Sequence, residues 1–208
     1  MYLFTRRARL THAAGLQWAV AITEHVRRAS DHDVQLWGTT YSPGYGTVSW
    51  TAWFEDLPHL ESFGDKLATD EAYQTMAAEG SSFTEGGVDD GLLQLLTAPP
   101  DPDREINYVT GVQAVCAGGN ARRAMELGMA IAEQAGTITG VPTMFVRSLS
   151  GPYGGVGWLT GHADIADMER ANDALAADDA WLDLVDTTDG AFVEDPAITT
   201  QTIYRKLA

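Results

Sequence analysis

Four arginines are the first residues of this acidic chain whose positions suggest a chemical role. Arg6, Arg7 and Arg9 crowd one predicted strand, and Arg147 lies on a later one. A guanidinium can hold a carboxylate, an enolate or a phenolate through two parallel hydrogen bonds. We therefore predict that Arg7, Arg9 or Arg147 binds an anionic group of a ligand. The alternative is that these arginines pair with acidic residues at a sheet edge.

His162 is the predicted general base. It ends a strand that we expect to reach the mouth of the fold, and imidazole changes its charge near neutral pH. The other histidines are His12, His25, His32 and His59, and no pair has the His-x-x-x-His or His–carboxylate spacing of a metal site. We predict no metal and no cofactor. The alternative for each histidine is a structural or exposed position.

Trp37, Tyr41 and Trp53 are the predicted wall of a flat apolar site. They fall outside the register of Trp50, which recurs as Trp158 and is predicted to pack in the core of each repeat. An apolar wall, a base and a cation together suit proton removal from an aromatic or enolisable substrate.

Two segments of the chain are copies of one another. Residues 41–73 return without a gap at residues 149–181, and twelve of the 33 aligned pairs are identical. The chain is therefore a duplication of one unit of roughly 100 residues. The arginines of the first strand are not repeated, because the second unit has Gly111, Val112 and Ala114 where the first has its three arginines.

We predict a first unit over residues 1–97, a proline-rich linker over 98–104 and a second unit over 105–208. In the first unit, the patterns indicate strands at 3–10, 34–41, 48–54 and 92–96, a helix to about residue 29, and helices capped by Asp56 and Asp70, with a loop at 86–91. In the second, they indicate strands at 106–116, 143–149, 156–162 and 198–207, a helix at 121–135 capped by Asn120 and stopped by Gly136, and helices capped by Asp164 and Asp178.

This order predicts the fold class. Each unit reads β-α-β-β-α-β, which is the ferredoxin-like order, so the class is α+β. A four-stranded sheet with helices on one face leaves its other face bare. We therefore predict that the tandem units form an intramolecular dimeric α/β barrel.

Composition limits the partners. The formal net charge is −16, which argues against nucleic acid and anionic membranes. No apolar run reaches the ~20 residues of a membrane helix, and the first residues do not resemble a signal peptide. Cys116 is the single cysteine, so no disulfide forms within the chain. We expect a cytoplasmic protein with a small-molecule ligand in the barrel, and a homo-oligomer is possible.

Several short motifs resemble the dimeric α/β-barrel superfamily. They are the Arg-x-Arg-Leu strand end at residues 7–10, the Ser-Pro-Gly-Tyr-Gly-Thr-Val-Ser-Trp turn and strand at 42–50, and the Asp-x-x-Tyr or Asp-x-x-Trp segments at 70–73 and 178–181. Within that superfamily the chain is most similar to NIPSNAP-like proteins and to antibiotic-biosynthesis monooxygenases.

The resemblance implies three alternatives for function. The first is a cofactor-independent monooxygenase or isomerase acting on an aromatic or enolisable substrate. The second is a non-catalytic NIPSNAP-like stress or assembly protein. The third is a haem-binding barrel, for which His25 is a candidate ligand only if its helix face is open.

Overall fold

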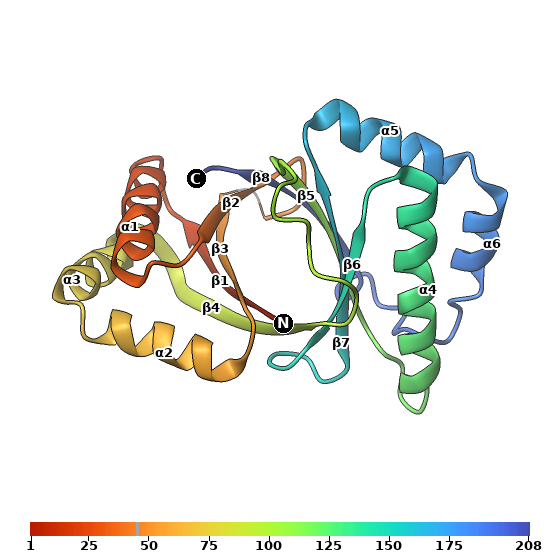
Figure 1. Ribbon diagram of the computed structural model, residues 1–208, viewed down its shortest axis with the longest axis horizontal. Helices are drawn as coiled ribbons and strands as arrows, with labels where there is room; N and C mark the ends of the chain where they lie inside the picture. The colour runs from red at the N-terminus through yellow and green to blue at the C-terminus, as the bar shows by residue number, and fades with distance from the viewer. Residues whose placement is uncertain (45) are drawn as a thin grey trace. The chain divides into compact units, whose positions relative to one another are not determined.

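The computed structural model describes residues 1–44 and 46–208, so Tyr45 of the predicted turn lies outside the described residues. The described chain contains six α-helices and eight strands, with the order β-α-β-β-α-α-β occurring twice (Figure 1). The strands follow the order β1-β3-β2-β8-β5-β7-β6-β4 in a closed barrel. The predicted α+β fold, a tandem duplication that forms an intramolecular α/β barrel, is confirmed.

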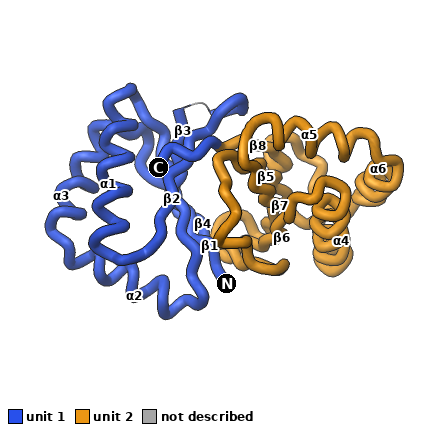
Figure 2. Tube along the Cα trace, turned by 45° about the horizontal axis from the view of Figure 1, so that its top comes forward, with its two compact units in different colours: residues 1–92, 205–208 blue, residues 93–204 orange. Residues whose placement is uncertain are grey.

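The chain divides into two compact units, which Figure 2 colours separately. Unit 1 comprises residues 1–92 and 205–208, and unit 2 comprises residues 93–204. Within unit 1 the last residues extend along β2, where Leu36 exchanges backbone hydrogen bonds of 2.8 Å with Ala208 and Leu207. Gly38 lies close to this segment, and a Cβ there would lie 2.8 Å from a terminal methyl group of Leu207, which would have to move.

Unit 1 packs three helices on one face of its sheet. Strand β3 pairs antiparallel with both β1 and β2. Phe54 of β3 is buried against Phe63 of α2, and Trp50 donates a 2.8 Å hydrogen bond to Thr23 of α1. The elements are β1 (Tyr2–Leu10), α1 (Ala14–Ser30), β2 (Val34–Thr40), β3 (Thr47–Phe54), α2 (Leu57–Ala68), α3 (Glu71–Glu79), the 3₁₀ turn η1 (Gly80–Ser82) and β4 (Thr84–Leu95), whose last residues belong to unit 2.

Unit 2 repeats this arrangement. Strand β7 pairs antiparallel with β5 and β6, and Trp158 of β7 donates a 2.9 Å hydrogen bond to the Gly128 carbonyl of α4. The two repeated tryptophans therefore tie sheet to helix in both units, which confirms their predicted core role. The elements are β5 (Tyr108–Val115), α4 (Ala121–Thr139), β6 (Thr143–Ser148), β7 (Gly155–His162), α5 (Ile165–Ala176), α6 (Asp179–Asp186) and β8 (Thr200–Lys206).

Strand register gives the true correspondence between the first strands of the units. Arg6 lies opposite Trp50 in unit 1, and Val112 lies opposite Trp158 in unit 2. Val112 is therefore the counterpart of Arg6, and the correspondence expected from sequence, which placed Gly111 there, is wrong by one residue. The conclusion that the arginines have no basic counterpart is unchanged.

Four aspartates begin the shorter helices as predicted. The carboxylate of each accepts a hydrogen bond of 2.7–2.8 Å from the backbone N–H three residues later, which satisfies an amide that the helix leaves without a partner. The four caps are Asp56, Asp70, Asp164 and Asp178.

Three local predictions need correction. The predicted loop at 86–91 lies within β4, where Gly86 and Gly87 adopt positive φ inside the strand. Helix α4 does not stop at Gly136 but runs to Thr139, and Gly140 ends it with φ 68°. Asn120 precedes this helix without capping it, and its amide donates to the Gly190 carbonyl at 2.9 Å instead.

Helical glycines give a matched test of this packing. A Cβ on Gly128 would lie 2.1 Å from the fully buried ring of Phe145, whereas a Cβ on Gly64 would meet nothing within 4 Å. We expect Gly128→Ala to destabilise the protein by about 2 kcal/mol through overpacking. We expect Gly64→Ala to stabilise it by up to about 1 kcal/mol through helix propensity. Urea-unfolding midpoints followed by tryptophan fluorescence measure both, and equal effects would contradict this packing.

Candidate ligand site

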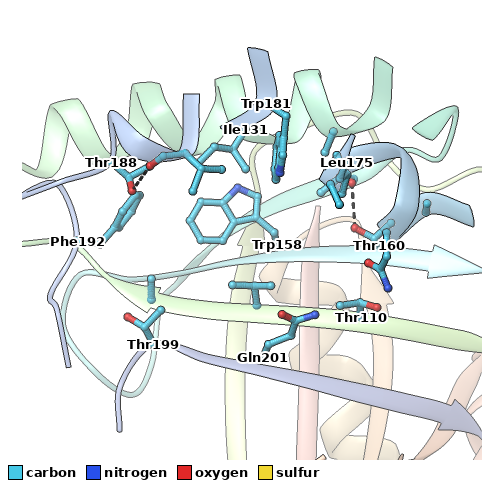
Figure 3. A pocket seen from close by; sticks show the side chains of 18 of the residues that line it. Thr110, Ile131, Trp158, Thr160, Leu175, Trp181, Thr188, Phe192, Thr199 and Gln201 are labelled. Atoms are coloured by element: carbon cyan, nitrogen blue, oxygen red, sulfur yellow. Dashed lines mark hydrogen bonds between the residues drawn. The ribbon is translucent and has the colours of Figure 1, made fainter. Parts of the chain in front are cut away.

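Unit 2 contains a pocket of about 830 Å³ between its sheet and its helices. The strands β5 and β7 form one wall, helices α4, α5 and α6 form the other, and residues 188–199 close one end. Figure 3 shows Trp158 at the centre of the wall, with Phe192 to one side and Leu175 to the other. Most of the lining is apolar, so the pocket has the character of a small-molecule site.

The central tryptophan is held in place from several sides. Its indole N–H donates to the Gly128 carbonyl, its ring centroid lies 5.3 Å from that of Phe145, and Phe192 meets it edge-on at 5.5 Å. Trp158 is 7% exposed. A flat aromatic surface therefore has a fixed position in the pocket.

Neutral polar groups interrupt the apolar lining. Thr160 shares a 2.9 Å hydrogen bond with Thr143, and both threonines line the pocket. Thr110 and Gln201 project from neighbouring parts of the sheet (Figure 3). Asn172 of α5 also lines the pocket. These hydroxyl and amide groups can both donate to and accept from a ligand.

His162 is the buried titratable side chain of this pocket. It is 3% exposed, and its Nε2 lies 3.4 Å from the Thr110 hydroxyl. Its Nδ1 lies 4.0 Å from a carboxylate oxygen of Asp167 and has no hydrogen-bond partner among the described residues. Burial lowers the pKa of His162 below its ordinary 6.5; the Asp167 carboxylate opposes that effect and the Arg104 guanidinium adds to it.

Asp167 is positioned independently of the histidine. It lies in the first turn of α5, where one carboxylate oxygen accepts the backbone N–H of Ala163 at 3.2 Å. The other oxygen accepts a 3.0 Å hydrogen bond from Arg170, and Arg104 lies 3.8 Å away. The carboxylate is thus held beside Nδ1, where it can orient the ring and stabilise its protonated form.

Comparison of the two units shows where unit 2 differs at its pocket. Phe54 of unit 1 corresponds to His162, since these residues lie opposite Tyr2 and Tyr108 in the matching ladders. By the same register, Phe4 corresponds to Thr110. Strands β1 and β3 of unit 1 are thus equivalent to β5 and β7 of unit 2, and Figure 1 labels all four. Two aromatic positions of unit 1 have therefore become polar in unit 2.

The helix wall has diverged in the same direction. The repeat aligns Phe63 with Ala171 and Gly64 with Asn172. All four residues line the pocket of their own unit, so the methyl group of Ala171 stands where unit 1 has the ring of Phe63. Unit 1 keeps a smaller pocket, of about 530 Å³, which its aromatic side chains line. Unit 2 therefore has a larger and partly polar pocket where unit 1 has packed aromatic side chains.

Three of the predicted residues of unit 1 lie on the face of the sheet opposite its helices. They are Arg7, Trp37 and Trp53. Arg7 and Trp37 both lie opposite Ser49, so the structure brings these two together on adjacent strands. Trp37 is 6% exposed and donates to Thr51 at 2.9 Å. Trp53 shares this face by strand alternation.

Two other predicted residues of unit 1 face solvent. Arg9 forms a 3.3 Å ion pair with Glu85, and both side chains are about two-thirds exposed. Tyr41 lies at the end of β2 with positive φ and is 79% exposed. Neither lines the 830 Å³ pocket of unit 2 or the smaller pocket of unit 1.

Arg147 and His162 are both in unit 2, but the structure does not bring them together. Arg147 is exposed and donates to Gln94 of the adjacent strand at 2.8 Å. It lies opposite Val156, six residues before His162 along β7, which corresponds to roughly 20 Å at ~3.3 Å per residue. Arg147 does not line the pocket that contains His162.

Several lining residues were not predicted from the sequence. Asn172 differs in type from its repeat partner Gly64, and that divergence is the signal that could have identified it. Thr110 lies outside the repeated segment, and only the strand register pairs it with Phe4. Phe192 and Thr188 lie after the repeated segment, where no internal comparison exists.

Two classes of site are absent from the described chain. Residues 1–44 and 46–208 hold no group of three or more His, Cys, Asp or Glu side chains that could bind a metal. No helix in this part of the chain is long and apolar enough to cross a membrane.

No protein-family model matches the sequence, and no curated protein matches it by sequence. Solved structures do match the fold. A Fusobacterium nucleatum protein, provisionally assigned as a monooxygenase, covers 100% of this chain and 92% of its own with a TM-score of 0.72 at 9% identity. An anthrone oxidase-like protein covers 100% and 91%, with a TM-score of 0.67 at 11% identity. A Burkholderia xenovorans NIPSNAP domain protein covers 49% and 100%, with a TM-score of 0.41 at 17% identity.

The first two similarities establish the fold. Both extend over the whole chain, so the protein has the dimeric α/β-barrel fold that the sequence resemblance implied. At 9% and 11% identity they establish no activity, and the function has to be argued from the pocket.

The buried histidine gives a pH prediction. Because the unfolded chain has the higher His162 pKa, it takes up the proton first, and the folded state loses stability as pH falls through about 6.5. We expect the urea midpoint of His162→Phe to fall less between pH 7.5 and 5 than that of the wild type. Histidine-selective NMR, with this variant as the assignment control, should show a His162 pKa below 6.5. A pKa at or above that value would contradict the described environment.

Proposed function

We propose that the chain is a cofactor-independent monooxygenase or isomerase that removes a proton from an aromatic or enolisable substrate held in the unit 2 pocket. The observation that carries the proposal is His162, a buried imidazole on the wall of an aromatic pocket at the position where unit 1 has Phe54. A buried histidine weakens packing relative to phenylalanine, so its presence at a diverged position supports a chemical role.

The geometry supports Nε2 as the basic nitrogen. Nε2 lies on the side of Thr110, which lines the pocket, whereas Nδ1 faces Asp167. In the neutral ring, a proton on Nδ1 leaves the Nε2 lone pair free to accept a substrate proton. The resulting imidazolium is then stabilised by Asp167. The lowered pKa keeps the ring in its basic form at neutral pH.

Neutral donors hold the charge that proton removal creates. No Arg or Lys lines the pocket among the described residues, whereas Thr110, Thr160, Asn172 and Gln201 present hydroxyl and amide groups to it. Such dipoles stabilise an enolate or phenolate when they are fixed and shielded from water. In this proposal they take the role that the sequence assigned to Arg7, Arg9 or Arg147.

A monooxygenase reaction then needs only dioxygen. The carbanion of a methylene between aromatic rings reacts with O₂; one oxygen atom becomes the carbonyl oxygen of the product and the other leaves as water. The methylene carbon loses two hydrogens in total, so the atoms balance without an added reductant. The likeness to an anthrone oxidase-like structure suggests anthrone itself as the first probe.

We therefore expect the purified protein to accelerate conversion of anthrone to anthraquinone in air, followed by absorbance. His162→Phe and His162→Gln should lower kcat/KM by about 10²–10⁴-fold, the usual contribution of a general base. The acid limb of the pH profile should lie below pH 6.5, since the lowered pKa keeps His162 neutral there. Equal rates for wild type and both variants would remove His162 from this role.

The non-catalytic assembly reading has less support. An assembly module needs no pocket, and unit 1 shows that this fold can fill much of the equivalent space with Phe54 and Phe63. Unit 2 instead places Ala171 and Asn172 there and opens about 830 Å³. The pocket therefore supports ligand binding, with or without assembly into a homo-oligomer.

The residues of the pocket do not fit haem. Haem iron takes an accessible His, Cys, Met or Tyr side chain as axial ligand, but the described lining of the pocket offers only His162, which is 3% exposed, and it contributes acidic side chains and no Arg or Lys to pair with the propionates. The Nε2 atom of His25, the other candidate, shares a 3.0 Å hydrogen bond with the Asp70 carboxylate. This contact gives the His25 side chain a structural partner.

Titration with haemin tests this conclusion. We expect no saturable Soret shift when the purified protein is mixed with haemin, because the described lining of the pocket supplies neither an open axial nitrogen nor a cation for a propionate. His162→Phe is the control for ligation by the pocket. A saturable shift in the wild type that this variant loses would restore the haem-binding alternative.

A further inference from the structure

We infer that the substrate of this pocket is a neutral or cationic aromatic, such as an arylalkyl amine, and that anionic aromatics are rejected. The inference rests on the proposed function, because it concerns the same pocket. It departs from the sequence prediction, in which arginines hold an anionic ligand.

The ionised side chains that line the pocket in the described chain are acidic. Asp189, Glu194 and Asp195 line it, and among the described lining residues no Arg or Lys offsets them. Asp189 and Glu194 are exposed and form no ion pair within the described chain, while Asp195 is half-buried and accepts the backbone N–H of Ala197 at 2.8 Å. All three lie on the segment that closes one end of the pocket, so a ligand entering there meets negative charge.

The nearest cations serve other contacts. Arg123 of α4 donates to the Thr187 carbonyl at 2.8 Å, next to the closing segment, but does not line the pocket. Arg104 lies at the opposite end, 3.8 Å from Asp167. Neither guanidinium is among the residues that line the pocket.

A second observation points to a ligand at this site. His162 lines the same pocket and is 3% exposed, and its pocket-side Nε2 makes only a long contact of 3.4 Å, to the Thr110 hydroxyl, within the described chain. The flat wall of Trp158 lies between this buried end and the acidic end. A ligand that spans the pocket thus places its rings on Trp158 and a polar or cationic group toward the acidic segment.

The long-range field acts in the same direction. A net charge of −16 attracts cations and repels anions, and an apolar pocket with one sign of charge at its end concentrates that preference. Three carboxylates at several ångströms, partly screened by water and salt, give about a tenfold preference for a cation over an anion of the same shape.

Three naphthalene probes test the inference on the full-length protein. They are 2-naphthylmethylamine as the cation, 2-naphthylmethanol as the neutral form and 2-naphthoate as the anion. Isothermal titration at pH 7.5 and low salt should give Kd values that rise in that order, with about tenfold between the first and the last. The difference should shrink at high salt.

Two sets of variants identify the cause. The triple variant Asp189→Asn, Glu194→Gln, Asp195→Asn should bring the cation and anion affinities to within about twofold. The control triple Glu55→Gln, Glu61→Gln, Asp65→Asn changes exposed residues of unit 1 by the same net charge and should retain most of the preference. Loss of the preference in both triples would assign it to net charge alone and overturn the role of the closing segment.

Filling the pocket separates this inference from the proposed function. Ala171→Phe restores the residue of unit 1 and should abolish binding of all three probes; Val185→Trp, on the exposed side of α6, serves if that variant does not fold. If the three probes bind equally well and either variant blocks their binding, the charge inference is wrong but the ligand pocket is supported. If no probe binds, both the charge inference and the ligand pocket are wrong.

Discussion

The hydrogen bond from Trp158 to the Gly128 carbonyl sets the spacing on which the pocket depends. A buried indole N–H must find an acceptor, and here the acceptor is the backbone of α4. Gly128 lets the ring of Phe145 approach the same helix, since a Cβ would lie 2.1 Å from it. The helix and the sheet are thereby held at a fixed separation beside the tryptophan. The pocket is the part of that gap which small residues leave open.

Duplication lets one unit act as the reference for the other. Trp50 bonds to Thr23 in unit 1 as Trp158 does to Gly128 in unit 2, so the scaffold is shared. Around this scaffold unit 1 buries Phe54 against Phe63, whereas unit 2 has His162 in the place of Phe54. A fold that is repeated within one chain can retain packing in one copy while the other loses some of it to a polar pocket. The asymmetry between the copies is therefore the observation on which the proposed ligand site depends.

Much of the fold follows from the sequence because its signals are local. Aspartate three residues before a helical amide predicted four caps correctly, and alternation predicted the central strands. Glycine was a weaker guide: Gly86 lies within a strand and Gly136 within a helix, where neighbouring contacts override its usual role. The pocket was harder still. Alternation divides Arg147 and Val146 between two faces of β6, but only the position of the helices decides which face encloses a site.

The absence of a cation from the described lining constrains the chemistry itself. Hydroxyl and amide dipoles stabilise a developing negative charge less strongly than a guanidinium does, and the acidic end of the pocket opposes that charge. A substrate that disperses the charge over its own rings reduces this difficulty, whereas one that concentrates it on a single oxygen does not. A base of lowered pKa is also a weaker base, which again favours an acidic, delocalised C–H or O–H bond. The wall, the donors and the base thus all favour a conjugated polycyclic substrate over a simple ketone.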